Sequence, residues 1–366
     1  MADSGEGVSG DGDALARLRL IRTPRVGPVS YRQLVARFGT AAAALEALPM
    51  LARRGGGEPL VVPSRGQVER EAATTARLGA RYLFIDDADY PPLLAELENA
   101  PPVLIVRGRT ALLATRCVAM VGARNASAAA CRFARQLAAD LAAEGATVVS
   151  GLARGIDTQA HVGAGAATIA VIASGIDVVF PPENAALQER LGEEALVVAE
   201  QPPGTEPRAR HFPYRNRIIA GLAQGTVVVE AVPKSGSLIT ARLAAEAGRE
   251  VMAVPGHPLD PRAQGCNLLI REGATLVQSA ADILELVRPI DPRSVRAPAD
   301  RYTAPPADAS DAERRTIATL LGPVPVAVDE LIRQSGLSPA AVQTVLLELE
   351  LAGRVERHAG GRVSAA

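Results

Sequence analysis

The 366-residue sequence has no tryptophan and only five phenylalanines, five tyrosines and three cysteines. The cysteines are odd in number, lie far apart and sit in apolar surroundings, so they favour a reducing compartment and argue against a disulfide framework. With the four histidines they form none of the spacings that are typical of zinc sites. We predict three buried, unpaired cysteines (Cys117, Cys131 and Cys266), no metal and no cofactor.

Long apolar runs and a leader sequence are also missing. Stretches such as TIAVIASGIDVVF are interrupted well before the roughly 20 residues that cross a bilayer. The first thirteen residues, MADSGEGVSGDGD, are acidic and glycine-rich, and they lack the basic start and apolar stretch of a signal peptide. We predict a disordered tail over residues 1–13, no membrane association and a cytoplasmic protein.

Lysine is nearly absent, since 38 of the 39 basic residues are arginine and Lys234 is the exception. The bias extends over the whole chain and is most simply a property of the genome. Because the formal net charge is only -1, the total charge does not indicate nucleic-acid binding. Any such contact must come from a local patch.

The two ends of the chain read as small helical modules. Residues 14–57 show short helices with apolar residues at helical spacing, in the manner of a helix-hairpin-helix or SAM-like module, and RRGGGEPL ends them. Such a module either contacts DNA backbones or only packs against protein, and the sequence pattern does not distinguish between these two roles. Residues 288–310, rich in proline and alanine, predict a linker.

Residues 311–366 predict a winged helix, with three helices and a ribbon. Its third helix, SPAAVQTVLLELELAG, begins at Ser338 and Pro339 and carries Glu348 and Glu350 but no basic residue. Carboxylates repel phosphate, and the arginines that read guanine are missing. We therefore expect this module to contact protein or to engage DNA only weakly.

Residues 80–287 alternate strands with helices. The strands are RYLFID, VLIVRG, CVAMVG, TVVSG, TIAVIASG, LVVAE, TVVVEA and EVMAVPG. Several are continuous apolar runs, as strands buried on both faces require, and the intervals allow crossover helices. The clearest helix covers 126–145, where Phe133, Leu137 and Leu141 recur every fourth residue and Gly145 follows as a cap. We predict a doubly wound, mostly parallel, Rossmann-like α/β sheet.

Four glycine-bearing loops follow strands of this region: VGARNAS, SGLARGID, SGIDVVFPPEN and KSGSLITAR. In an open parallel sheet these loops meet at the carboxyl edge, where helix N-termini present N–H groups to anions. Each loop alone is also what a tight turn needs. Together they predict a phosphate-binding rim.

Ordinary nucleotide enzymes do not fit these loops. VGARNA is not GxGxxG, and no GxxxxGK[ST] motif occurs. Ser235 and Ser237 could be nucleophiles, but nothing in the sequence places a histidine beside them. We find no catalytic constellation and predict a binding protein that is not an enzyme.

The segment PRARHFPYRNRIIAGL, residues 207–222, lies between two predicted strands and belongs to the same rim. Its arginines at 208, 210, 215 and 217 predict phosphate contacts, Phe212 or Tyr214 a stacking face, and Asn216 a base contact. The alternative is that the aromatic rings are packed and the arginines merely cover a helix start.

Several motifs in order resemble the DprA/Smf family of DNA-processing proteins. They are VAMVGARNAS, VVSGLARGIDTQAH, TIAVIASGIDVVFPPEN, EQPPGTEPRARHFPYRNRIIAGL, VVVEAVPKSGSLITARLAAEAGREVMAVPG and NLLIREGATLV. The resemblance covers about residues 80–287, and the two terminal modules fit it more loosely. It implies an extended Rossmann-like domain that binds single-stranded DNA, forms a homodimer and loads RecA during natural transformation.

The resemblance assigns the DNA-binding residues to the first, second and fourth glycine loops and to the basic segment around RNR. With their neighbours, the candidates are Gly122, Arg124, Ser150, Gly151, Arg154, Arg210, His211, Phe212, Arg215, Asn216, Arg217, Lys234, Ser235, Gly236, Ser237 and Thr240. A lone lysine beside the fourth loop fits a tight anion site. The chain departs from the family where Ala123 replaces a serine, where Gln201 replaces an aromatic residue and where AHVGAGAATIAV is about three residues short.

Two other functions use the same features. A nucleotide sensor or nucleotide hydrolase would bind mononucleotides in the same crevice and ignore oligo-dT. A scaffold whose basic segment binds an acidic protein would bind no oligonucleotide.

Overall fold

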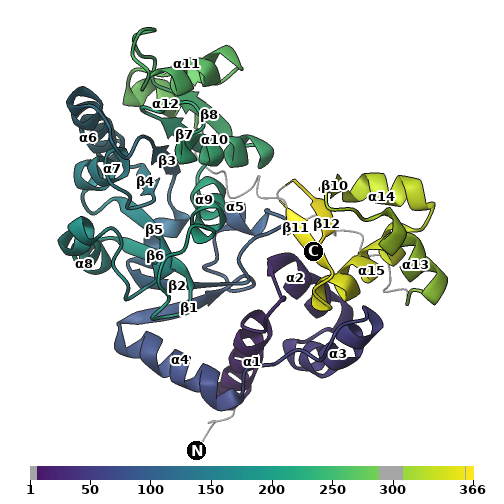
Figure 1. Ribbon diagram of the computed structural model, residues 1–366. Helices are drawn as coiled ribbons and strands as arrows, with labels where there is room; N and C mark the ends of the chain where they lie inside the picture. The colour runs from purple at the N-terminus through teal and green to yellow at the C-terminus, as the bar shows by residue number, and fades with distance from the viewer. Residues whose placement is uncertain (1–5, 288–307, 359) are drawn as a thin grey trace, which may run out of the picture. The chain divides into compact units, whose positions relative to one another are not determined.

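The computed structural model describes residues 6–287, 308–358 and 360–366 (Figure 1). The chain divides into two compact units: residues up to 70 with those from 308 onward, and residues 71–287. The boundary after residue 70 falls within helix α4 (Arg65–Arg77). Most of the predicted linker over 288–310 lies outside the described residues.

The central unit is built on a nine-stranded sheet (Figure 1). Its strands are β1 (Ala80–Phe84), β2 (Val103–Gly108), β3 (Cys117–Val121), β4 (Thr147–Ser150), β5 (Thr168–Gly175), β6 (Leu196–Gln201), β7 (Gly225–Val228), β8 (Glu250–Ala253) and β9 (Thr275–Leu276). They lie in the order β1-β2-β6-β5-β4-β3-β7-β8-β9. β2 pairs antiparallel with β1 and β6, and the other neighbours are parallel. The predicted mostly parallel α/β sheet is confirmed.

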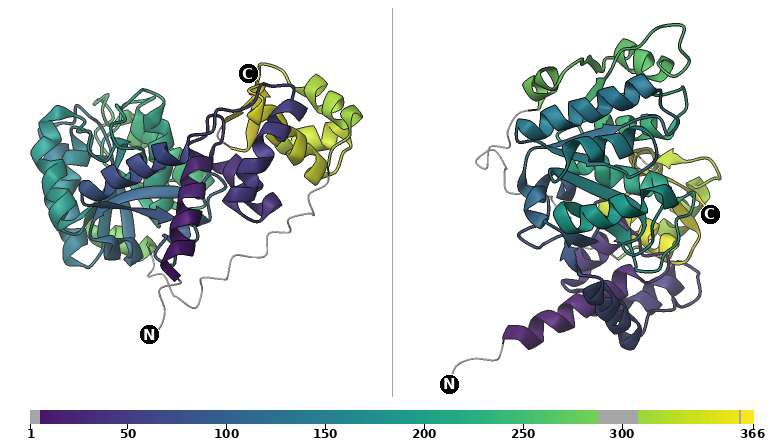
Figure 2. Two further views of the ribbon diagram at one scale, coloured as in Figure 1. Left: turned by 90° about the horizontal axis from the view of Figure 1, so that it is seen from below. Right: turned by 90° about the vertical axis from the view of Figure 1, so that its left-hand side faces the viewer.

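Helices cover both faces of this sheet (Figures 1 and 2). They are α5 (Pro92–Ala95), α6 (Ala128–Ala143), α7 (Ile156–Ala164), α8 (Ala185–Glu194), α9 (His211–Leu222), α10 (Gly236–Glu246), α11 (Gln264–Arg271) and α12 (Ala280–Leu286). Successive β3 residues serve opposite faces: Met120 shares a core with Leu137 of α6, and Val121 shares the other with Ile218 of α9. Strands buried on both faces therefore need apolar residues at every position.

The predicted helix over 126–145 is confirmed as α6. Ser127 caps its start by accepting a hydrogen bond from the Ala130 N–H at 3.0 Å, and Gly145 follows its end at φ 75°. Leu137 and Leu141 are buried, and Phe133 packs against the same core.

The chain order of the strands creates the crevice. β3 enters the middle of the sheet, β4, β5 and β6 follow on one side, and β7 lies on the other side of β3. Such a reversal separates the loops at the carboxyl ends of the strands and leaves room for a ligand.

The terminal unit combines both ends of the chain. The amino-terminal module contains α1 (Glu6–Ile21), α2 (Pro28–Phe38) and α3 (Ala41–Arg54). Because α1 already begins at Glu6, the prediction of a tail through Asp13 is wrong for residues 6–13. An ion pair from Asp13 to Arg17, one helical turn onward, stabilises this early part of the helix.

The winged helix is confirmed in the second half of this unit. It contains α13 (Asp311–Leu320), β10 (Val326–Ala327), α14 (Val328–Ser335), α15 (Pro339–Leu351), β11 (Val355–His358) and β12 (Arg362–Ala365). α15 serves two cores: Val342 and Leu346 pack within the winged helix, whereas Leu347 and Leu351 belong to the core of the amino-terminal module. The two modules therefore share one helix.

Among the described residues, no single helix has both the length and the hydropathy to cross a bilayer. Helices α2 and α3 have the necessary length and hydropathy only when they are taken together, and that pair is bent by 106°.

Candidate functional site

A small hollow opens at the carboxyl edge of the central sheet, and we call it the crevice hollow. Its volume is about 40 Å³. Since one water needs about 10–15 Å³ on this scale, the hollow can enclose a small group such as a phosphate, and a larger ligand would extend out of it. Arg124, Gly151, Arg154, Phe180, Phe212 and Arg215 are among its lining residues. Three of the predicted loops and the basic segment thus meet here.

Arg124 and Arg154 are the exposed cations of the crevice hollow. Arg124 follows β3, and its guanidinium lies 5.2 Å from the centre of the Phe212 ring. Arg154 follows β4 and stands 3.6 Å from Glu183, with both side chains 58% exposed. An exposed ion pair of this kind contributes little stability, so Arg154 remains available to an anion.

Arg215 also lines the hollow, but its side chain is buried. Its Nη1 donates to the carbonyl oxygens of Gly151 and Val171, the latter at 2.6 Å. Burial lowers the pKa of Arg215 to about 10, so the group stays charged at neutral pH. The guanidinium joins the end of β4 to the middle of β5, and this fixed position makes it a structural cation first.

Arg217 is committed elsewhere. Its side chain is 4% exposed and forms an ion pair with Glu200 at the end of β6. Asn216 donates from Nδ2 to the Gly236 carbonyl at 3.4 Å, which links α9 to the fourth glycine loop. Both residues hold α9 in place, and neither lines the crevice hollow as the structure describes it.

A buried polar network fixes the second glycine loop. The Leu152 N–H donates to Nε2 of His161 at 3.3 Å, so Nδ1 of the neutral ring carries the proton and donates to Thr168 Oγ1 at 2.8 Å. The Ala153 N–H donates to Asp157 at 3.4 Å. Burial, aided by the charge of Arg215, lowers the pKa of His161 to about 3. Burial raises the pKa of Asp157 to about 6 against the opposing effect of Arg215.

Asp157 and His161 should cancel each other's effect on stability between about pH 4 and pH 6. At pH 5 the folded chain holds a proton on Asp157 and none on His161. The unfolded chain, with ordinary pKa values of 3.8 and 6.5, holds the reverse. Both states bind one proton, so this pair gives the free energy of unfolding no slope with pH.

Single variants should reveal the two opposing slopes in urea unfolding curves. In Asp157→Asn only His161 remains, so lowering the pH from 6 to 4 should cost about 1.4 kcal/mol per pH unit relative to wild type. In His161→Asn only the raised pKa of Asp157 remains, and the same change should stabilise the chain equally. Parallel pH profiles for the three proteins would contradict this assignment.

The aromatic side chains differ from the expected arrangement. The stretch from His211 is helix α9, in which Phe212 is half-buried at the crevice hollow and Tyr214 is exposed outside its lining. Phe212 is flanked by Arg124, by Arg215 and by the Phe180 ring, whose centre is 5.7 Å away. Phe180 is 43% exposed, so it offers the more open face at the hollow. The sequence signal for it is the aromatic residue within the third glycine loop.

Other predicted residues shape the rim from the inside. An added Cβ at Gly122 would come within 2.6 Å of Ile156, and Ser150 donates to the Met120 carbonyl at 2.7 Å. Arg210 is exposed, whereas His211 is only 8% exposed. The pKa of His211 is lowered first by burial and then by the positive charge of Arg210. These close contacts explain small or fixed side chains at this edge.

The fourth glycine loop lies outside the lining of the crevice hollow, as far as the described chain shows. Lys234 is exposed and has a positive φ of 67°. The hydroxyls of Ser235 and Ser237 lie 2.6 Å apart, and Thr240 is buried in α10. Gly236 is exposed at the start of α10. This loop would contact a ligand that extends beyond the hollow.

Three family models together match most of the chain. The family model described as DNA recombination-mediator protein A matches residues 81–288, which is more than half of the chain. The chain belongs to the DprA/Smf family. The DprA-like N-terminal HHH domain matches residues 11–74, and the DprA winged helix domain matches residues 301–361.

Individual DprA proteins are similar over the same region. The DNA processing protein DprA of Streptococcus pneumoniae is 46% identical over 206 residues, which are 56% of this chain and 72% of that protein. Its X-ray structure matches with a TM-score of 0.59 and 42% identity, covering 62% of this chain and 79% of that one. The DprA of Helicobacter pylori, whose structure concerns its single-stranded DNA binding mode, matches with a TM-score of 0.52 and 28% identity over 56% of this chain and 94% of that one.

The departure at Ala123 leaves the DprA loop intact. The Ala123 N–H donates to the Glu230 carbonyl at 2.7 Å, and the Ala123 carbonyl accepts from the Ile156 N–H at 3.2 Å. Both contacts use the main chain. The missing hydroxyl therefore does not alter the course of the first glycine loop.

Proposed function

We propose that this member of the DprA/Smf family binds single-stranded DNA along the carboxyl edge of its central sheet. The observation that carries the proposal is a phosphate-sized hollow between two exposed arginines, Arg124 and Arg154, with an exposed aromatic ring beside it. Cations that track the backbone and rings that stack bases are the combination that single strands need. The relationship to a DprA whose structure concerns single-stranded DNA adds support.

Within this site we assign separate tasks to the residues. Arg124 and Arg154 would hold a phosphate, and Phe180 would stack on a base, because the Phe212 ring is flanked by two guanidinium groups and by Phe180 itself. Arg210, Lys234 and Gly236 are exposed on neighbouring loops and would contact the next phosphates. Arg215, Asn216 and Arg217 would act by fixing the loops and α9.

We further infer that the protein is a homodimer, acts in the cytoplasm and loads RecA on incoming single strands. Membership of the DprA family supports these points. We infer binding without catalysis, since the hydroxyls of Ser235 and Ser237 pair with each other at 2.6 Å. A nucleotide sensor or hydrolase is the competing function, and the absence of GxGxxG and GxxxxGK[ST] motifs from the sequence counts against it.

An oligo-dT titration at several salt concentrations tests the site. Arg124→Ala/Arg154→Ala should bind at least about tenfold more weakly, and its salt slope should be shallower by about 1.4, since each phosphate contact on a single strand contributes about 0.7. Phe180→Leu should also weaken binding but leave the slope unchanged, because it removes stacking without removing charge. Filament assembly by RecA on the same strands should weaken with each variant.

Arg190→Ala/Arg271→Ala is the matched control, because both side chains are exposed and neither lines the crevice hollow. Equal affinity of the control and the Arg124/Arg154 variant would contradict the site. A mononucleotide that raises the melting temperature while oligo-dT does not would favour the sensor.

A further inference from the structure

A winged helix ordinarily places its third helix in the DNA major groove. Here that helix, α15, is covered by protein. α15 gives Leu347 and Leu351 to the core of the amino-terminal module. The two modules approach so closely that a Cβ on Gly55 would lie 2.0 Å from the Glu348 carbonyl oxygen. Gln33 of α2 also donates to Gln343 of α15 at 2.8 Å. α15 is therefore occupied by protein, and a groove cannot reach this face.

A second hollow lies along this seam, and we call it the seam hollow. Its volume is about 170 Å³, and its lining includes Arg54 and Gly55 from the amino-terminal module and Arg314, Arg315, Glu348 and Arg354 from the winged helix. The cations that α15 lacks are thus gathered beside it. Both modules are needed to form the hollow.

The one carboxylate in this lining is already neutralised. Glu348 is 1% exposed and accepts from Nε of Arg314 at 2.8 Å and from its Nη2 at 3.0 Å. This pairing raises the pKa of Arg314 above its ordinary value. Three exposed arginines remain at the hollow: Arg54, Arg315 and Arg354.

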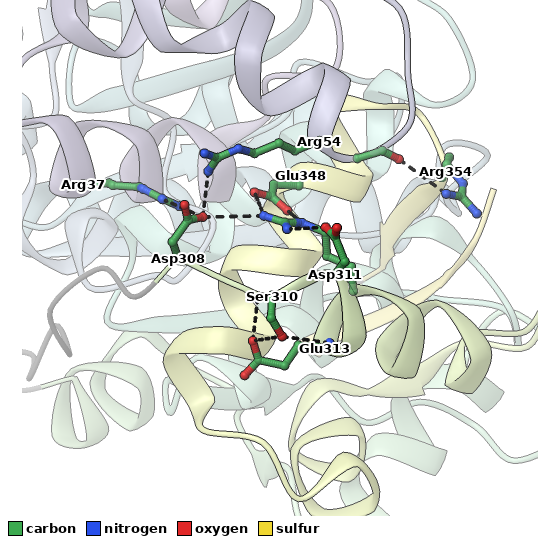
Figure 3. Close-up of polar contacts among 10 residues, drawn as sticks. Arg37, Arg54, Asp308, Ser310, Asp311, Glu313, Glu348 and Arg354 are labelled. Carbon is green, nitrogen blue, oxygen red and sulfur yellow. Dashed lines mark hydrogen bonds and ion pairs between the residues drawn. The ribbon is translucent and has the colours of Figure 1, made fainter.

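Asp308 occupies part of this arginine cluster (Figure 3). Its Oδ1 lies 2.6 Å from Arg54, 3.5 Å from Arg314 and 3.9 Å from Arg37. The Asp308 side chain is nevertheless 57% exposed, and Arg37 Nη1 is buried without a hydrogen-bond partner among the described residues. One carboxylate oxygen serves three guanidinium groups, whereas a phosphate would offer several oxygens to the same donors.

We propose that the seam hollow binds a phosphate group, for which Asp308 is the internal competitor. The phosphate belongs to the backbone of nucleic acid. The contact involves no base readout, because α15 is covered by the amino-terminal module. This source rests on the proposed function, but the affinity of the hollow for phosphate does not. The terminal unit then adds a second, sequence-independent contact to that of the crevice hollow.

The test uses the full chain carrying Arg124→Ala/Arg154→Ala, so that the crevice hollow is disabled. Labelled oligo-dT and a short blunt duplex are titrated by fluorescence anisotropy, and inorganic pyrophosphate is tested by its effect on the melting temperature at constant ionic strength. Adding Arg54→Gln/Arg315→Gln/Arg354→Gln should weaken DNA binding about tenfold. It should also abolish the pyrophosphate shift. The control triple is Arg53→Gln/Arg333→Gln/Arg362→Gln, all exposed in the same unit and absent from this lining.

Asp308→Asn distinguishes a loss of the site from a folding defect. Removal of the competing carboxylate should tighten binding, which misfolding cannot do. A response to pyrophosphate without a response to DNA would retain the site but overturn nucleic acid as its ligand. Equal losses in the seam and control triples, or an unchanged affinity in Asp308→Asn, would overturn the site. If the disabled background binds oligo-dT as wild type does, the crevice proposal fails independently.

Discussion

Arg215→Met should lower the free energy of unfolding by about 3–5 kcal/mol, the usual cost of breaking a buried charged contact. The guanidinium donates to two carbonyl groups, that of Gly151 just after β4 and that of Val171 within the neighbouring strand β5. Without it both acceptors stay buried and unpaired. Asp157 would also lose the positive charge that partly offsets its burial. Urea unfolding monitored by circular dichroism measures the loss.

Arg124→Ala is the informative comparison, because Arg124 lines the same hollow but is exposed. Its free energy of unfolding should stay within about 0.5 kcal/mol of wild type. Its affinity for oligo-dT should fall. If Arg215→Met instead keeps its urea midpoint and loses only affinity, then Arg215 is a direct ligand and its structural role is refuted.

Gly155→Ala should be the second severe substitution, with a cost of about 3 kcal/mol or more. Gly155 has φ 75° and ψ −122°, a conformation that L-residues rarely adopt. An added Cβ would also lie 2.2 Å from the Ala123 carbonyl oxygen and 2.7 Å from that of Arg124. Both clashes are with main-chain atoms of the first glycine loop, so the first and second glycine loops would have to separate.

Gly145→Ala separates strain from clash. Gly145 has the same φ of 75°, but nothing lies within 4 Å of its added Cβ. Its cost should be only about 1 kcal/mol. Thermal unfolding of the two variants side by side decides the matter, and similar melting temperatures would show that the close approach of the loops is relaxed in solution.

The central sheet could be predicted from the sequence because each buried strand has a recognisable pattern. β3 to β8 are runs of apolar residues bounded by glycine or polar residues, and their loops had to meet at one edge. β9 has two residues, Thr275 and Leu276, and is too short to show any pattern. The start of α1 was missed because glycine and acidic residues are poor evidence for a helix.

The site was predicted in outline, but the tasks of individual residues were not. Arginine is normally an exposed residue, so a cluster of arginines reads as a phosphate track. Whether Arg215 and Arg217 are buried depends on carbonyl groups and on Glu200, which lie on other elements. Phe180 was overlooked for a related reason: its approach to Phe212 joins the third glycine loop to the start of α9, which is distant in sequence.

The packing of Gly55 and Gly57 against the end of α15 has a consequence for how such a chain can be shortened. An added Cβ on Gly57 would lie 2.5 Å from the Ala352 Cα, so neither glycine can gain a side chain unless the other end of the chain changes too. Deleting the winged helix alone would leave the amino-terminal module without Leu347 and Leu351. In the history of a gene like this one, the first and last segments would have to be kept, altered or lost together.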